Sequence, residues 1–124
     1  MKKRGKKQVS EHRIVRLQEQ IREEIAKMIY THKIKDSRVD SFLCINRVVI
    51  SSDLSFAKVY VSSFMDEHVT KQGVAGLENA SGFIRSSLGH LLHIRKIPSF
   101  TFIYDKSIKE GQEMIHLIDS LNIK

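Results

Sequence analysis

Three small residues, Ala80-Ser81-Gly82, interrupt an apolar pattern that otherwise predicts one amphipathic helix over residues 69–94. A glycine inside a helix costs about 1 kcal/mol relative to alanine, and small residues leave the main chain open to close approach. The pattern therefore predicts two helices that meet at this break. The first N–H groups of the second helix lack partners within the helix, and such groups suit a phosphate.

Basic side chains follow the break and could bind the same kind of ligand. We expect Arg85, Arg95 and Lys96 to contact phosphate as a group. The alternative for each is a solvated face, as for most charges on small domains. For Arg13, Arg16 and Lys27, at the edge of the first predicted helix, the solvated interpretation is favoured.

A second candidate surface lies on the predicted strands. Lys58 and Tyr60 alternate with the apolar Ala57, Val59 and Val61, so both should lie on the wet face of a sheet. A Lys-x-Tyr pair there could hold a phosphate and stack a base. A solubilising lysine beside an ordinary strand tyrosine is the competing interpretation, and Arg47 on the preceding strand shares both.

The remaining reactive side chains do not indicate catalysis. His90 and His93 have a spacing that permits metal binding, but no third ligand lies nearby in the sequence. Cys44 is expected to be buried and inert, and Asp53 to be a turn residue. No phosphate-binding loop, nucleophile elbow or carboxylate pair occurs. We therefore predict no enzyme, no metal, no cofactor and no small-molecule substrate.

Composition limits the class of protein. The 124 residues are 41% hydrophobic, which suits one domain with a core, and the net charge of +7 indicates an anionic partner. Nucleic acid, an acidic protein and a membrane surface all meet that description. Cys44 is the only cysteine, and Met1-Lys2-Lys3-Arg4 leads into no apolar segment. We expect a cytoplasmic monomer without a membrane span.

Periodicity predicts a basic flexible arm over residues 1–9 and one domain over residues 10–124. Its elements should be a helix capped by Ser10 and running to Tyr30, strands over 42–50 and 56–64, the broken helix, a strand over 100–104 introduced by Pro98, and a last helix capped by Asp105 or Ser107. The short turn between the first two strands implies an antiparallel hairpin. Three strands can bury one face only, so we predict an α+β two-layer domain with helices on that face.

Several stretches, in this order, resemble the ribosome-binding factor A family. They are Arg16 to Ile25, Val48 to Ser62 with its Asp-Leu turn and Ala-Lys-Val-Tyr-Val strand, Gly82-Phe83-Ile84-Arg85, Arg95 to Phe102, and Asp105-Lys106-Ser107. The resemblance covers nearly the whole chain. It implies a type II KH-like fold in which an Ala-x-Gly kink, here Ala80-Ser81-Gly82, replaces the usual Gly-x-x-Gly loop.

The resemblance also implies a function. The chain would bind 16S rRNA in the immature 30S subunit, assist late maturation and rRNA processing, and have a role in cold shock. The expected RNA-binding residues are Ala80, Ser81, Gly82, Arg85, Arg95, Lys96, Lys58 and Arg47. A protein-interaction module that docks on an acidic partner is the alternative.

A literal Gly-x-x-Gly also occurs, at Gly73-Val74-Ala75-Gly76. Its middle residues are apolar, whereas KH loops usually place a basic residue there. It would also leave a very short helix after the second strand. We therefore expect the helix to break at Ala80-Ser81-Gly82 and not at this second motif.

Overall fold

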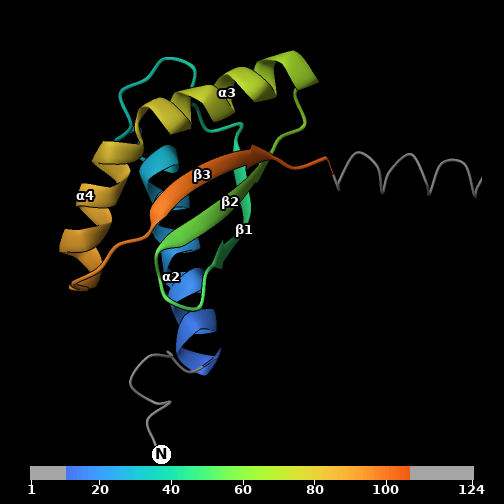
Figure 1. Ribbon diagram of the computed structural model, residues 1–124. Helices are drawn as coiled ribbons and strands as arrows, with labels where there is room; N and C mark the ends of the chain where they lie inside the picture. The colour runs from blue at the N-terminus through green and yellow to red at the C-terminus, as the bar shows by residue number, and fades with distance from the viewer. Residues whose placement is uncertain (1–10, 107–124) are drawn as a thin grey trace, which may run out of the picture.

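The computed structural model describes residues 11–106 and has three helices packed on a three-stranded sheet (Figure 1). The elements, in chain order, are α2 (Glu11–Tyr30), β1 (Cys44–Ile50), β2 (Phe56–Ser62), α3 (Glu67–Asn79), α4 (Ser81–Leu92) and β3 (Ser99–Tyr104). The predicted α+β class and the order of these elements are confirmed. The basic arm, the Ser10 cap and the last predicted helix lie outside the described residues.

The sheet has the order β1-β2-β3, with β1 and β2 antiparallel and β2 and β3 parallel. The hairpin turn is held by Asp53, whose carboxylate accepts hydrogen bonds from the Ser51 hydroxyl and the Ser55 N–H. The next residue, Leu54, has a φ of 64°. Asp53 is therefore a turn residue, as predicted, because its side chain replaces backbone partners within the turn.

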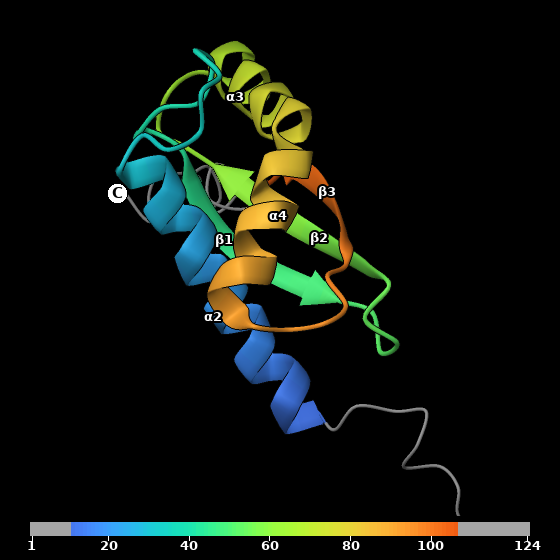
Figure 2. The same cartoon turned by 90° about the vertical axis from the view of Figure 1, so that its left-hand side faces the viewer.

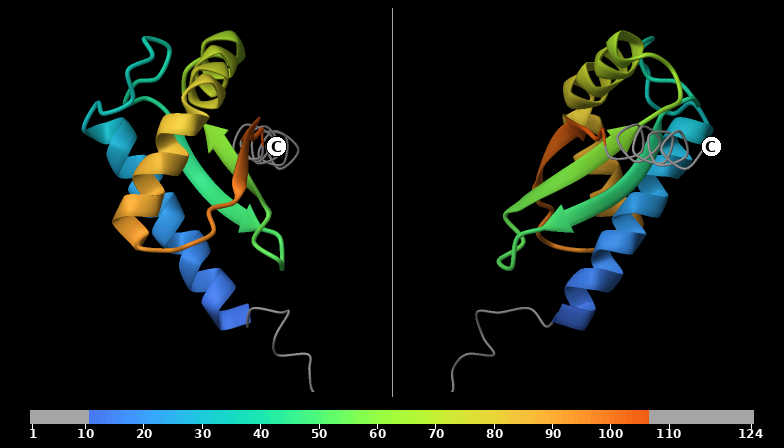
Figure 3. Two further views of the ribbon diagram at one scale, coloured as in Figure 1. Left: turned by 60° about the vertical axis from the view of Figure 1, so that its left-hand side comes forward. Right: turned by 90° about the vertical axis from the view of Figure 1, so that its right-hand side faces the viewer.

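All three helices lie on one face of the sheet, which Figure 2 shows from the helix side. The right panel of Figure 3 shows β1 and β2 from the side away from α4. Side chains from the sheet and the helices bury one another between the layers. One buried cluster joins the layers, and its members include Ile21, Ile25, Val59, Val61, Leu88 and Phe102.

Side chains of the helices also accept hydrogen bonds from backbone N–H groups at the two outer edges of the sheet. The Gln18 side chain of α2 accepts a hydrogen bond from the Ile50 N–H of β1 at 2.9 Å. On the opposite edge, the Glu78 carboxylate of α3 accepts one from the Phe102 N–H of β3 at 3.0 Å. Unpaired N–H groups at a strand edge invite pairing with another chain, so these contacts protect the sheet.

The path from β2 to β3 is broken at Ala80, where α3 ends and α4 begins with a new direction (Figure 1). The Gly73-Val74-Ala75-Gly76 motif lies inside α3, and both of its glycines are buried. A Cβ at Gly73 would lie 2.8 Å from Leu43 side-chain atoms, and one at Gly76 would lie 2.9 Å from side-chain atoms of Asp36 and Val39. These glycines therefore let α3 approach the connector after α2, and they form no loop.

The second helix ends two residues before its predicted end at residue 94, and Pro98 is not what stops it. Helix α4 ends at Leu92, and His93 follows in the left-handed conformation with a φ of 53°. A left-handed residue stops a helix because the next N–H turns back toward the last carbonyls. Glycine or asparagine usually takes this place, so a histidine gave no signal. Pro98 is buried and comes directly before β3.

Candidate nucleic-acid interface

The break between α3 and α4 exposes the start of a helix without a side-chain cap. Ala80 ends α3, with its N–H donating to the carbonyls of Gly76 and Leu77, and it also precedes α4. Its carbonyl accepts from the Ile84 N–H at 3.0 Å, and no side chain caps α4. The N–H groups of the first turn of α4 therefore have no partner within the helix.

Gly82, in that first turn, points into open space. A Cβ built on it would meet no atom within 4 Å, and its backbone φ is not positive. The fold of the described residues therefore does not require glycine at this position. No described part of this chain fills the space at Gly82, so the space is open to an outside molecule.

Two lysines and a phenylalanine surround the break. Lys33 and Lys35, from the connector after α2, line a pocket of about 210 Å³ together with Ala80 and Phe83. Both lysines are exposed, and the Phe83 side chain is 48% exposed. The sequence did not predict this grouping, because nothing in the spacing of Lys33 and Lys35 shows that the connector returns to residue 80.

Asp36 ties the connector to the end of α3. Its carboxylate accepts hydrogen bonds from the Arg38 guanidinium at 2.8 and 2.9 Å and from the Asn79 amide at 3.1 Å. The Arg38 side chain, then the Arg38 backbone N–H and the Asn79 amide, hold the pKa of Asp36 well below its usual range. The bonds to Asn79 and Arg38 fix the connector that carries the two lysines beside the break.

Arg85, a predicted phosphate ligand, is bonded within the chain. Its guanidinium donates to the carbonyl oxygen of Ile97 at 2.8 Å and to that of Pro98 at 3.1 Å. These bonds fasten the segment between α4 and β3 to the side of α4. The structure thus gives Arg85 a positioning role that its sequence pattern did not indicate.

Arg95 and Lys96 lie beyond the other end of α4. The Lys96 ammonium donates to the Asp53 carbonyl at 3.1 Å and to the Ser55 hydroxyl at 3.3 Å, which links this segment to the hairpin turn. Both residues line a pocket of about 500 Å³ that also includes Arg13 and Arg16 of α2. The sequence placed these pairs on separate surfaces, and the fold brings them together.

The strand residues lie where they were predicted, on the sheet face that the described helices leave uncovered. The Arg47 guanidinium stacks over the Tyr60 ring, 4.1 Å from its centroid. Lys58 is exposed on the central strand, and Phe56 on the same strand is 68% exposed. Arg47 and Tyr60 thus occupy each other, and Lys58 remains available to a ligand.

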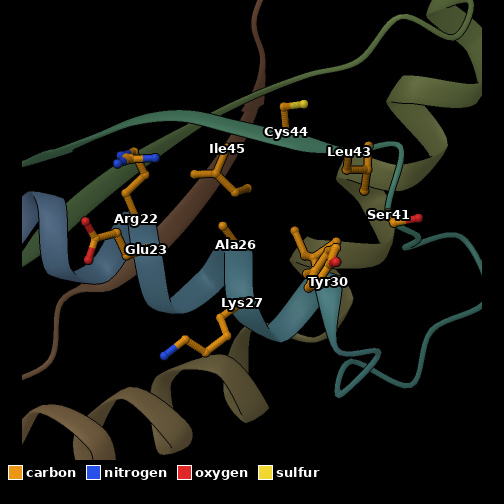
Figure 4. A pocket seen from close by; sticks show the side chains of 10 residues that line it. Arg22, Glu23, Ala26, Lys27, Tyr30, Ser41, Leu43, Cys44 and Ile45 are labelled. Atoms are coloured by element: carbon orange, nitrogen blue, oxygen red, sulfur yellow. The ribbon is translucent and has the colours of Figure 1, made fainter.

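Cys44 is exposed, so the prediction that it is buried is wrong. A β-bulge between Ile45 and Arg47 shifts the alternation of β1 by one residue, which places Cys44 on the outside. Its neighbours form a groove of about 490 Å³ between α2 and β1, lined also by Lys27, Tyr30 and Ile45 (Figure 4). No charge of one sign dominates this groove, because Arg22, Glu23 and Lys27 all line it.

Two other features concern residues 11–106 only. Within that range no group of three or more His, Cys, Asp or Glu side chains is placed to hold a metal ion. No helix in the same range is long and apolar enough to cross a membrane.

Apart from Arg85, which lies within α4, the expected RNA-binding residues fall into three places. Ala80, Ser81 and Gly82 are at the start of α4, and Arg95 and Lys96 follow its end. Lys58 and Arg47 lie on the uncovered sheet face. Helix α4 separates the first two places, and the sheet separates both from the third (Figure 2).

Comparisons with known proteins agree with this fold and give it a family. A sequence profile described as ribosome-binding factor A matches residues 13–118. Ribosome-binding factor A of Treponema denticola is 65% identical over 91% of this chain and 86% of its own length. That of Treponema pallidum is 50% identical over 93% of this chain and 91% of its own length.

Structures with the same fold are also described as ribosome-binding factor A. A putative ribosome binding factor A from Thermotoga maritima matches with a TM-score of 0.65 and 26% identity, covering 77% of this chain and 89% of that one. A Thermus thermophilus RbfA homology model fitted into the cryo-EM map of a 30S-RbfA complex matches with a TM-score of 0.60 and 23% identity, covering 75% and 96%. On the profile match and the identity to the Treponema proteins, the chain belongs to the ribosome-binding factor A family.

Proposed function

We propose that this chain binds 16S rRNA in the immature 30S subunit and assists late maturation and 16S rRNA processing. It acts as a cytoplasmic monomer without catalysis. Family membership supports the ribosomal partner, and the net charge of +7 suits RNA. The Thermus protein in the 30S complex map shares the fold of this chain.

One observation supports RNA binding at a particular surface, the start of α4. This helix starts without a side-chain cap, beside an outward-facing glycine and two exposed lysines. A helix start attracts anions through its free N–H groups and its dipole. Lys33 and Lys35 add charge, and the exposed ring of Phe83 offers a surface on which a base can stack. We assign Ala80, Ser81 and Gly82 the role of the type II KH-like kink that approaches the RNA backbone.

We assign different roles to the other predicted RNA-binding residues. Arg95 and Lys96 supply phosphate contacts, and Lys58 and Arg47 supply a further cationic surface on the sheet. Arg85 acts by holding the segment that carries Arg95 and Lys96, since its guanidinium is bonded to backbone carbonyls. The mechanism is differential affinity, because a binder shifts an RNA conformation only as far as it prefers one form.

The test is binding of purified 16S rRNA at several salt concentrations, with Lys33→Gln and Lys35→Gln as variants. Each lost phosphate contact should flatten the log–log salt slope by about 0.7–0.9. Lys71→Gln is the matched control, since Lys71 is exposed at the far end of α3 and pairs with Glu67 at 2.9 Å. Circular dichroism serves as the control for folding.

The proposed surface fails if both folded variants keep the affinity and the salt slope of the Lys71→Gln control. The proposed function fails if the parent protein shows no saturable binding to 16S rRNA and an acidic protein partner is instead captured without RNA.

A further inference from the structure

A cationic pocket lies between the first half of α2 and the segment that joins α4 to β3. Its volume is about 500 Å³, and its lining includes Arg13, Arg16, Arg95 and Lys96 but no acidic residue. Arg13 and Arg16 are about 80 residues away from the other two in the sequence. Folding therefore gathers like charges from two distant segments at one place.

Gathering like charges costs free energy unless an anion offsets it. The end of α4 explains cations on one wall of the pocket, since a helix C-terminus favours positive charge. It does not explain Arg13 and Arg16 on the opposite wall, which belong to the first turns of α2. An anion between the walls would relieve the repulsion from both sides.

Two arginines in the pocket are free to bind such an anion. The acidic residue nearest to Arg16 along α2, Glu19, pairs elsewhere, with Arg22 at 2.8 Å. Within residues 11–106, neither Arg16 nor Arg95 forms an ion pair or a side-chain hydrogen bond. Guanidinium groups bind phosphate oxygens through two parallel N–H bonds, which makes arginine the favoured residue for this task.

The wall that carries Arg95 is held in place by the residues that directly follow it. Lys96 is anchored to the hairpin turn through Asp53 and Ser55, and Arg85 holds the carbonyls of Ile97 and Pro98. A segment fixed before binding loses less conformational entropy when a ligand arrives. The pocket is therefore built before any ligand enters it.

We propose that this pocket holds one phosphate of the RNA backbone between Arg16 and Arg95. The inference rests on the proposed RNA-binding function and adds a second contact to it. The pocket lies past the end of the 12-residue α4, about 18 Å from the break at its start. One folded RNA would thus be held at both ends of α4, which sets the orientation of the protein on the RNA.

The experiment measures the affinity of the full chain for purified small subunits at several salt concentrations. The variants are Arg16→Gln, Arg95→Gln and the double variant, and Lys27→Gln is the control. Lys27 is exposed and also on α2, but it lies outside the pocket. Lys27→Gln therefore removes one positive charge, as each single pocket substitution does, without changing the pocket. Thermal melting checks that every variant is folded.

Each single substitution should weaken binding by about tenfold or more relative to Lys27→Gln, because charge-assisted hydrogen bonds are lost. The salt slope should flatten by about 0.7–0.9 in the singles and no further in the double variant, since one phosphate is released. The affinity of the double variant should lie within about threefold of that of the weaker-binding single variant, because the two residues share one ligand.

Three results would overturn the inference. The first is pocket variants that bind like Lys27→Gln while the parent still binds, which would leave the RNA-binding function intact. The second is fully additive losses with a second flattening of the slope, which would mean separate phosphates. The third is adenosine monophosphate binding at the pocket as tightly as the subunit, which would mean a nucleotide site. A parent protein that does not bind small subunits would instead contradict the proposed function itself.

Discussion

At the scale of single residues, the same amino acid has opposite roles at two nearby positions. Gly76 is buried in α3 against Asp36 and Val39, whereas Gly82 faces open space at the start of α4. The sequence shows glycines at both places and two competing motifs around them. Only the packing decides that Gly76 serves the fold and that the space at Gly82 is left for a partner.

Alanine substitution at the two positions should therefore have opposite effects. Gly76→Ala should lower the free energy of unfolding by about 1–3 kcal/mol, because its Cβ would overlap side-chain atoms of Asp36 and Val39. Gly82→Ala should leave that free energy unchanged or raise it by up to about 1 kcal/mol, since alanine favours helix. Urea denaturation measures both. Equal destabilisation by the two changes would contradict this difference in packing.

Gly82→Val extends the test to binding. Because the space around Gly82 is open, the Gly82→Val variant should keep its fold. A β-branched side chain there would still block the approach of an RNA backbone to the start of α4. We expect lower affinity for 16S rRNA at every salt concentration, measured by filter binding. Unchanged affinity in the folded variant would show that RNA does not approach this turn.

Asp36 should make stability depend on acid pH. Its pKa is lowered in the fold, mainly by the Arg38 side chain, so its stabilising effect is complete above the ordinary aspartate pKa of 3.8. That effect should be lost progressively as the pH falls below this value, because the unfolded chain then binds the proton first. Urea midpoints between pH 6 and pH 3 measure it. Asp36→Asn should show a weaker decline over this range, and an identical decline would exclude Asp36 as a cause.

At the scale of elements, alternation and helical periodicity predicted most of the fold. Periodicity predicted a first helix that ends at Tyr30, and the Ala57-Val59-Val61 alternation predicted which face of β2 is covered. The errors have local causes. A bulge between Ile45 and Arg47 reversed the expected burial of Cys44, and His93 ended α4 five residues before Pro98. Bulges and left-handed histidines leave no periodic signal.

The packing of α2 and α4 on the sheet gives a quantitative expectation. Ile25 and Leu88 have no exposed surface, and both belong to the buried cluster between the layers. Ile25→Ala or Leu88→Ala should lower the free energy of unfolding by about 2–5 kcal/mol, because each leaves a cavity. Val15→Ala, at a position 56% exposed on α2, should change it by less than about 0.5 kcal/mol. Similar losses at Val15 and Ile25 would mean that α2 packs through another face.

At the scale of the whole molecule, the sequence predicted a basic binding protein, but it did not predict which cations act together. Lys33 and Lys35 meet the break only because the connector after α2 folds back onto α3. Arg16 meets Arg95 only because α2 passes the end of α4. Long-range proximity of this kind depends on the packing of complete elements, and residue spacing within one segment does not encode it.

The central claim is that this basic chain recognises the immature small subunit. Co-sedimentation of the parent protein with immature small subunits, mature small subunits and large subunits at near-physiological salt tests it most directly. We predict saturable binding to small subunits, tighter to the immature than to the mature form, with weak and readily salt-displaced association with large subunits. Equal binding to small and large subunits would reduce the interaction to unspecific charge attraction and would contradict the claim.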